Sequence, residues 1–274
     1  EKFLVKVEGT SKGFLPNDVE IAATSSIIEK KSKLGAKPGT KKEFDKLVYS
    51  YLTKNNAYVC IFIDEGLGGV PYGIQEQTAI CCVFDELSAI NALNTIRQGY
   101  KTKIVVCYKK DSELMNLVKI INQIIPRLIT KKIELGFFHI NFKNYTDSDY
   151  PILIAVCLEI SLKIADNEKI KHISIPASPT FLSGKIIDEF IKRVTNESKI
   201  PLFPLFGTDR QMFNDLQELG ISSKARKVEN MISKNFKKIP NVSEKLVHES
   251  LKSEKKISVD IGPNNVHDIL DALE

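Results

Sequence analysis

The chain has 274 residues, of which 43% are hydrophobic and 27% are charged. This composition is typical of a folded globular protein and excludes disordered and collagen-like chains. The length exceeds that of most single compact domains, so we expect a main domain with a smaller companion. No uninterrupted apolar run approaches the roughly 20 residues that cross a bilayer, and the first residues lack the apolar core of a signal peptide. We therefore expect a soluble, cytoplasmic protein without a membrane partner.

The net charge of +5 is modest, but the charges are unevenly distributed along the sequence. Residues 222–256 hold ten Lys or Arg against four Glu, whereas residues 257–274 hold four acids and no Lys or Arg. Such a basic stretch is typical either of a solvated helical face or of a surface that faces RNA.

In the N-terminal region, the order of apolar segments and turns predicts a small α+β unit. We expect a strand, a helix, a loop rich in Lys and Gly, and a hairpin closed by the polar turn at residues 54–56. The predicted strands are residues 3–7, 47–52 and 57–63, and the predicted helix is residues 18–31.

After the glycine-rich residues 66–73, apolar strands alternate with helices. Strands are predicted at residues 78–84, 103–108, 136–142 and 172–176, and helices at residues 86–97, 112–125, 150–165 and 183–194. This order, with strands that are apolar throughout, predicts a doubly wound α/β fold in which helices cover both faces of a parallel sheet. Ligands bind beyond the carboxyl ends of such strands, so we expect a nucleotide site at the turn after Phe84.

Beyond Gly220 the sequence predicts a small helical appendage. Helices are expected at residues 222–236 and 243–253, followed by a short apolar segment at residues 257–259 and a last helix from Asn265. The predicted domains are therefore residues 1–65, 66–221 and 222–274.

The five cysteines each lie in an apolar stretch, which is typical of reduced core thiols in a cytosolic protein. Cys81 and Cys82 are neighbours in a predicted strand, so their side chains point to opposite faces and could not readily chelate one ion together. We expect core thiols and no metal site from the set Cys60, Cys81, Cys82, Cys107 and Cys157.

Three stretches together resemble the tRNA 4-thiouridine synthetase family, which joins an RNA-binding THUMP domain to a PP-loop ATPase domain. Residues 11–16, SKGFLP, are similar to a THUMP turn, and residues 200–210, IPLFPLFGTDR, are similar to a segment that precedes a helix in the catalytic domain. Residues 66–73, GLGGVPYG, resemble the junction between the two domains and are the most specific of the three. Taken singly, such Gly/Pro clusters are also common in linkers.

In that family, a Ser-Gly-Gly-x-Asp-Ser loop after the first strand binds ATP for adenylation of a tRNA uridine. The corresponding residues here are VFDELS at 83–88, where only Ser88 matches. Side chains at the glycine positions obstruct the approach of pyrophosphate to the backbone N–H groups, and two carboxylates repel it. The resemblance thus implies a vestigial nucleotide loop made of Val83, Phe84, Asp85, Glu86 and Ser88, with Pro176 and Lys185 in a second drifted region. We expect no cofactor, or ATP with Mg²⁺ held by Asp85 and Glu86 if the loop still functions.

The resemblance fails at two other features of the family. The sulfur-transfer cysteine expected near residues 146–151 is missing, and Cys157 is interpreted as a core residue because nothing basic nearby in sequence would stabilise its thiolate. The given sequence aligns from partway into the THUMP unit, so the ferredoxin-like domain that precedes it in the family is either truncated or lost, and we expect weak RNA binding by this chain alone.

Three functions remain open on the sequence. The first is a non-catalytic tRNA-binding protein that contacts phosphates through Lys12, Lys37, Lys41, Lys42, Lys224, Arg226, Lys227, Lys237 and Lys238. The second is an active tRNA sulfurtransferase that adenylates and then thiolates uridine with an atypical loop and an external sulfur source. The third is an interaction scaffold whose basic helices bind a protein partner or a second copy of the chain.

Overall fold

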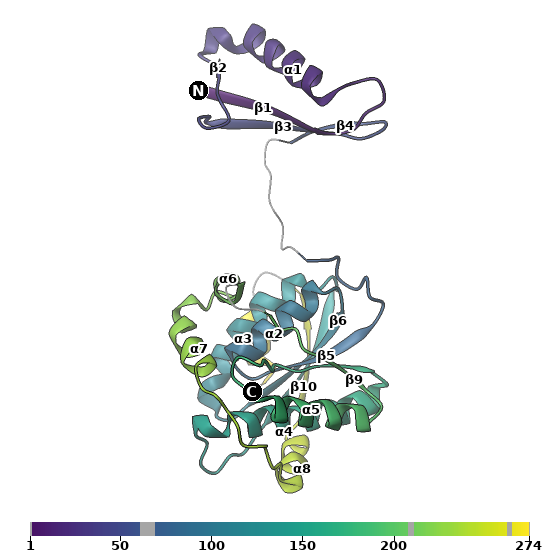
Figure 1. The fold of residues 1–274 in the computed structure, drawn as a ribbon, viewed down its shortest axis with the longest axis vertical. Coiled ribbons are helices and arrows are strands. Elements are labelled where there is room, and N and C mark those ends of the chain that lie inside the picture. Colours follow the sequence, from purple (N-terminus) through teal and green to yellow (C-terminus); the bar gives the residue numbers. More distant parts are fainter. Residues whose placement is uncertain (1, 61–68, 208–210, 262–264, 274) are drawn as a thin grey trace. The chain divides into compact units, whose positions relative to one another are not determined.

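The computed structural model describes residues 2–60, 69–207, 211–261 and 265–273. The chain divides into two compact units, Glu1–Gly68 and Gly69–Glu274 (Figure 1). Each unit is described by itself.

The first unit is a four-stranded sheet with one long helix. Its sheet has the order β2-β1-β3-β4, with β1 parallel to β2 and β3, and with β3 and β4 forming an antiparallel hairpin. The elements are β1 (Lys2–Gly9), α1 (Pro16–Lys31), the 3₁₀ helix η1 (Ser32–Leu34), β2 (Lys37–Pro38), β3 (Lys46–Leu52) and β4 (Ala57–Cys60). The predicted strand, helix and hairpin are confirmed here, while residues 61–63 of the last predicted strand lie outside the described residues.

The core of the first unit is built on alternate residues of β1, which are buried. Phe3, Val5 and Val7 are buried and pack against α1 residues such as Val19 and Ile27. Alternate residues of a strand point to one face, so this register places the apolar side chains of β1 under the helix.

The second unit contains a six-stranded sheet of order β10-β7-β6-β5-β8-β9. All neighbouring strands are parallel except β10, which pairs antiparallel with β7. The strands are β5 (Thr78–Val83), β6 (Lys101–Tyr108), β7 (Lys132–His139), β8 (His172–Ser174), β9 (Ile200–Leu202) and β10 (Lys255–Asp260). Residues 79–83 of β5 are buried, as expected for a central strand covered on both faces.

Helices cover both faces of this sheet, so the predicted doubly wound α/β fold is confirmed. Figure 1 shows α2 and α3 on one face and α4 and α5 on the other. The helices are α2 (Glu86–Arg97), α3 (Asp111–Ile124), α4 (Tyr150–Glu168), α5 (Gly184–Asn196), α6 (Gln211–Glu218), α7 (Ala225–Ile232), α8 (Glu244–Lys252) and α9 (Asn265–Asp271), with the 3₁₀ helices η2 (Ile125–Arg127), η3 (Asp147–Asp149) and η4 (Ser222–Lys224). Within the described part of the chain, no helix is both long and apolar enough to cross a bilayer.

The C-terminal segment belongs to the main sheet, which corrects the predicted boundary at residue 222. Ile257 and Val259 are buried and alternate with polar residues, a pattern that favours a half-buried edge strand. This strand, β10, pairs with β7 in a register that sets Ile257 opposite Leu135. Gly69–Glu274 is consequently one compact unit.

Other elements also differ from the prediction. β7 begins at Lys132 rather than at residue 136, because Ile133 and Leu135 continue its buried face. The predicted helix at 222–236 divides into η4 and α7, which ends at Ile232. β9 was not predicted, since it has only three residues and contains Pro201, a residue confined to sheet edges and strand ends.

Candidate functional site

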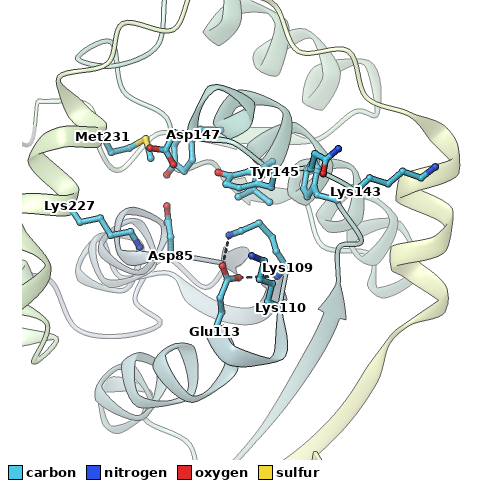
Figure 2. A pocket seen from close by; sticks show the side chains of 13 residues that line it. Asp85, Lys109, Lys110, Glu113, Lys143, Tyr145, Asp147, Lys227 and Met231 are labelled. Carbon is cyan, nitrogen blue, oxygen red and sulfur yellow. Dashed lines mark hydrogen bonds and ion pairs between the residues drawn. The ribbon is translucent and has the colours of Figure 1, made fainter.

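A cavity of about 400 Å³ opens at the carboxyl ends of the sheet's central strands, next to the first turn of α4 (Figure 2). It lies at the turn after Phe84, where the sequence placed a nucleotide site. Its lining residues are Asp85, Lys109, Lys110, Glu113, Phe142, Lys143, Asn144, Tyr145, Asp147, Tyr150, Leu153, Lys227 and Met231.

The loop between β5 and α2 is closed by its own side chains. The Ser88 Oγ accepts hydrogen bonds from the backbone N–H groups of Phe84 and Asp85, both at 2.8 Å. The Asp85 carboxylate accepts hydrogen bonds from the Ser88 N–H at 2.8 Å and from the Ser88 hydroxyl at 2.7 Å. This is a capping box, and its carboxylate occupies the anion-binding position at the start of α2.

Glu86 is the second carboxylate of this loop, and it is 5% exposed. Its Oε2 forms an ion pair with Lys227 Nζ of α7 at 2.7 Å. Burial opposes the charge on Lys227, but the hydrogen bond and charge of Glu86 prevail and raise the pKa of Lys227. Because α7 is distant in sequence, this pair joins the C-terminal basic segment to the loop.

Asp85 is held in an environment that disfavours its negative charge. Burial and the neighbouring Glu86 carboxylate raise the pKa of Asp85, against the opposing effect of the hydrogen bonds from Ser88. Asp85 therefore retains a proton to higher pH than an ordinary aspartate.

Lysines that the sequence analysis did not select surround the cavity. Lys109 and Lys110 follow the last residue of β6, and Lys143 lies shortly after β7. The Lys109 Nζ is 3.2 Å from Glu113 Oε1 and 4.7 Å from the centre of the Tyr145 ring, and Figure 2 shows Lys109 and Glu113 joined in the cavity. Lys110 and Lys143 are exposed and form no ion pair within the described residues. The sequence indicates these lysines by their positions after strands of a parallel sheet, because ligands bind beyond the carboxyl ends of such strands.

Aromatic side chains line the same cavity. Phe142 and Tyr145 meet edge to face with their ring centres 5.3 Å apart. Tyr150 is buried, and its ring centre lies 6.1 Å from that of Phe84. Phe142 and Tyr145 are half-buried, and lysines beside such accessible aromatic rings are suited to phosphate contacts and base stacking.

The structure brings together most of the predicted loop but leaves two members apart. Val83, Phe84, Asp85, Glu86 and Ser88 are contiguous at the end of β5, as their sequence order requires. Pro176 is buried near β8 and borders a separate void of about 10 Å³ beside Cys82 and Cys157. Lys185 is exposed in the first turn of α5 and does not line the cavity.

The predicted RNA-binding lysines of the first unit lie at two ends of its sheet. Lys37 is paired with Lys2 at the start of β1, and Lys41 and Lys42 lie in the turn that follows β2. Lys12 lies beyond the opposite end of β1. An eight-residue strand spans about 25 Å, so these lysines do not form one compact patch.

The basic residues predicted in the C-terminal segment are arranged around α7. Lys224 ends η4, Arg226 and Lys227 lie in α7, and Lys237 and Lys238 are exposed in the segment before α8. Of these, Lys227 lines the cavity.

Comparison with solved structures shows that the fold is shared with known proteins. A crystal structure of a 4-thiouridine synthetase–RNA complex with bound ATP matches with a TM-score of 0.60 and 13% identity, over 94% of this chain and 74% of that chain. The crystal structure of PH1313 from Pyrococcus horikoshii Ot3 matches with a TM-score of 0.52 and 17% identity, over 80% of this chain and 65% of that chain. No protein-family model and no curated protein sequence matches the chain. At these identities the likeness shows the fold alone.

Proposed function

We propose that the chain is a tRNA-binding protein related to tRNA 4-thiouridine synthetases, in which ATP-dependent thiolation chemistry has been lost. The observation that carries this proposal is the self-capped loop, whose backbone N–H groups already bond to Ser88 and Asp85.

Binding of a polyphosphate at this loop has to overcome two costs. Displacing a capping carboxylate costs about 1 kcal/mol. Each close contact between phosphate and an ionised carboxylate costs about 4 kcal/mol near a protein surface. The repulsion is the larger cost, and it comes from Asp85 when ionised, because the charge of Glu86 is balanced by Lys227. ATP binding in the manner of an open glycine-rich loop is therefore disfavoured.

RNA binding, in contrast, uses features that the cavity retains. Lys110 and Lys143 are exposed beside the aromatic rings of Phe142 and Tyr145, and Lys237 and Lys238 extend the basic surface of the same unit. The first unit, as a THUMP-like module, adds Lys37, Lys41 and Lys42. That one structural neighbour was crystallised with RNA supports this assignment.

An active sulfurtransferase is the alternative, and it requires Mg²⁺ between the phosphates and the loop carboxylates. Glu86 is paired with Lys227, and Asp85 is bonded to Ser88, so both carboxylates would first have to leave these partners.

The test is calorimetric titration of the full chain with ATP and Mg²⁺, followed by tRNA binding measured by filter retention. We expect no heat of ATP binding and salt-sensitive tRNA binding. Lys110→Glu with Lys143→Glu should weaken tRNA binding by at least about tenfold, because each substitution replaces a phosphate contact by a repulsion.

Lys185→Glu is the matched control, since Lys185 is an exposed lysine of the same unit outside the cavity. Micromolar ATP binding would overturn the loss of chemistry and support the sulfurtransferase. Unchanged tRNA affinity in the double variant would contradict the RNA surface.

A further inference from the structure

Three cysteines from distant parts of the sequence converge in the core of the second unit. Cys82 lies in β5, Cys107 in β6 and Cys157 in α4, and each is at most 2% exposed. Their sulfur atoms all lie within 4.8 Å of one another, and the Sγ atoms of Cys82 and Cys107 are 3.3 Å apart. We call this set the cysteine trio. The proposed RNA-binding function makes no use of it.

The spacing of the trio matches sulfur ligands around a single ion. Three sulfurs placed about 2.3 Å from a central metal in a trigonal plane lie about 4.0 Å from each other. The separation of the Cys82 and Cys107 sulfurs, 3.3 Å, is shorter than this value, and the limit of 4.8 Å on all three separations includes it. Small side-chain rotations would therefore be enough to bring the three sulfurs to bonding distance from one ion.

A disulfide is less compatible with the strand register. Cys82 is paired with Val105 in the parallel β5–β6 ladder, so Cys107 is a diagonal neighbour two residues further along. Neighbouring strands lie about 4.8 Å apart and two residues rise about 6.6 Å, so the two Cα atoms are about 8 Å apart, whereas disulfides need less than about 7 Å. A shared ion can bridge this separation without moving either strand.

The ligand set points to a soft ion of low coordination number. Thiolates select Cu(I) and Zn²⁺ over hard cations, but structural zinc sites require four ligands in a tetrahedron. Among the described residues, no further His, Cys, Asp or Glu joins the trio. The adjoining void of about 10 Å³ is at the lower limit for one water molecule. Three-coordinate Cu(I) fits these constraints better than zinc.

We propose that Cys82, Cys107 and Cys157 form a three-coordinate binding site for Cu(I). Binding forms copper–sulfur bonds and breaks the S–H bond of each thiol that ionises, with its proton released to solvent. No electron is transferred. No sequence motif predicts this site, because its ligands come from three separate elements.

The test uses the reduced full-length chain under anaerobic conditions. Cu(I) is supplied as its acetonitrile complex to native protein and during refolding, and binding is measured by competition with bathocuproine disulfonate. We expect one Cu(I) per chain and, in X-ray absorption, three sulfur neighbours at about 2.3 Å. Cys82→Ala and Cys157→Ala should each lower the affinity by about 100-fold or more, since even removal of a supporting residue costs 10- to 100-fold at metal sites.

Cys81→Ala is the matched control, because Cys81 is a fully buried neighbour in β5 whose side chain points to the opposite face. Circular dichroism checks that the variants fold. For the wild-type chain, Cu(I) should protect the trio but not Cys81 from N-ethylmaleimide in mild denaturant, read by mass spectrometry. The proposal would be overturned if the wild-type chain did not bind Cu(I), or if Cys81→Ala lost as much Cu(I) affinity as the trio variants. It would also be overturned if the trio variants kept their Cu(I) affinity, or if the trio were alkylated despite bound Cu(I).

Discussion

At the scale of single residues, the Ser88 side chain makes several of the hydrogen bonds that close the loop between β5 and α2. Its hydroxyl is fully buried, accepts two backbone N–H groups and donates to Asp85. A buried donor that loses its acceptor costs about 1–3 kcal/mol. The same hydroxyl therefore stabilises the loop and keeps it closed to a phosphate.

Ser88→Ala should lower the free energy of unfolding of the second unit by about 2–4 kcal/mol, because it leaves two backbone donors without their acceptor. The measurement is urea denaturation followed by circular dichroism. Ser161→Ala is the control, since Ser161 is equally buried but only donates to the Cys157 carbonyl of its own helix, and its loss should cost about 1 kcal/mol. If both variants lost the same free energy of unfolding, the loop hydrogen bonds of Ser88 would stabilise the protein no more than a single hydrogen bond within a helix does.

Part of the site could be predicted from single residues. The pattern of an apolar strand followed by a helix predicted that Asp85, Glu86 and Ser88 lie at the carboxyl edge of a parallel sheet. In the structure, these residues lie at that edge. Lys110 and Lys143 obey the same rule but lie outside the stretches of highest basic charge density, so charge density along the sequence does not predict them. The cysteine trio depends on strand order and on the placement of α4, which no local pattern encodes.

At the scale of elements, the long apolar elements were predictable, and so were the short helices α8 and α9, whereas the pairing of the edge strands was not. α2 occupies the predicted residues because Asp85 supplies an N-cap and its first residues begin a helical apolar pattern. β9 and β10 are edge strands whose pairing depends on partners distant in sequence. α6 is likewise fixed by tertiary contacts, because Arg97 of α2 pairs with Asp215 and Glu218 of α6.

Arg97→Ala should destabilise the second unit by about 3 kcal/mol, the lower end of the cost of breaking a buried ion pair, since Asn94 still donates to Asp215. Asp215 is fully buried, so its charge loses a partner that water cannot replace. Arg193→Ala, which breaks ion pairs with the partly exposed Glu159 and Glu189, should cost no more than about 1 kcal/mol. Thermal and urea unfolding would measure the loss of stability in both variants. Equal losses would show that burial of Asp215 does not make its ion pair with Arg97 more stabilising than an exposed pair.

At the scale of the whole molecule, the net charge of +5 is too small to indicate a nucleic-acid partner by itself. The fold gathers Lys110, Lys143 and Lys227 from three separate segments around one cavity. This local concentration of lysines, rather than the net charge, supports the proposed RNA surface. Two of these lysines are free of ion pairs within the described residues, whereas Lys227 is held by Glu86. The unpaired lysines are therefore the ones expected to exchange counterions for RNA phosphates.

This difference predicts how salt acts on tRNA binding. Each phosphate contact adds about 0.7–0.9 to the slope of log affinity against log salt concentration, so Lys110→Gln with Lys143→Gln should reduce that slope by about 1.5. Lys227→Gln should change it by less, because Glu86 already neutralises Lys227 and would be left unpaired. Filter-binding assays from 50 to 300 mM KCl would measure the three slopes. If Lys227→Gln alone reduced the slope as much as the double variant, Lys227 would have to leave Glu86 on RNA binding, and the ion pair that joins α7 to the loop would break in the complex.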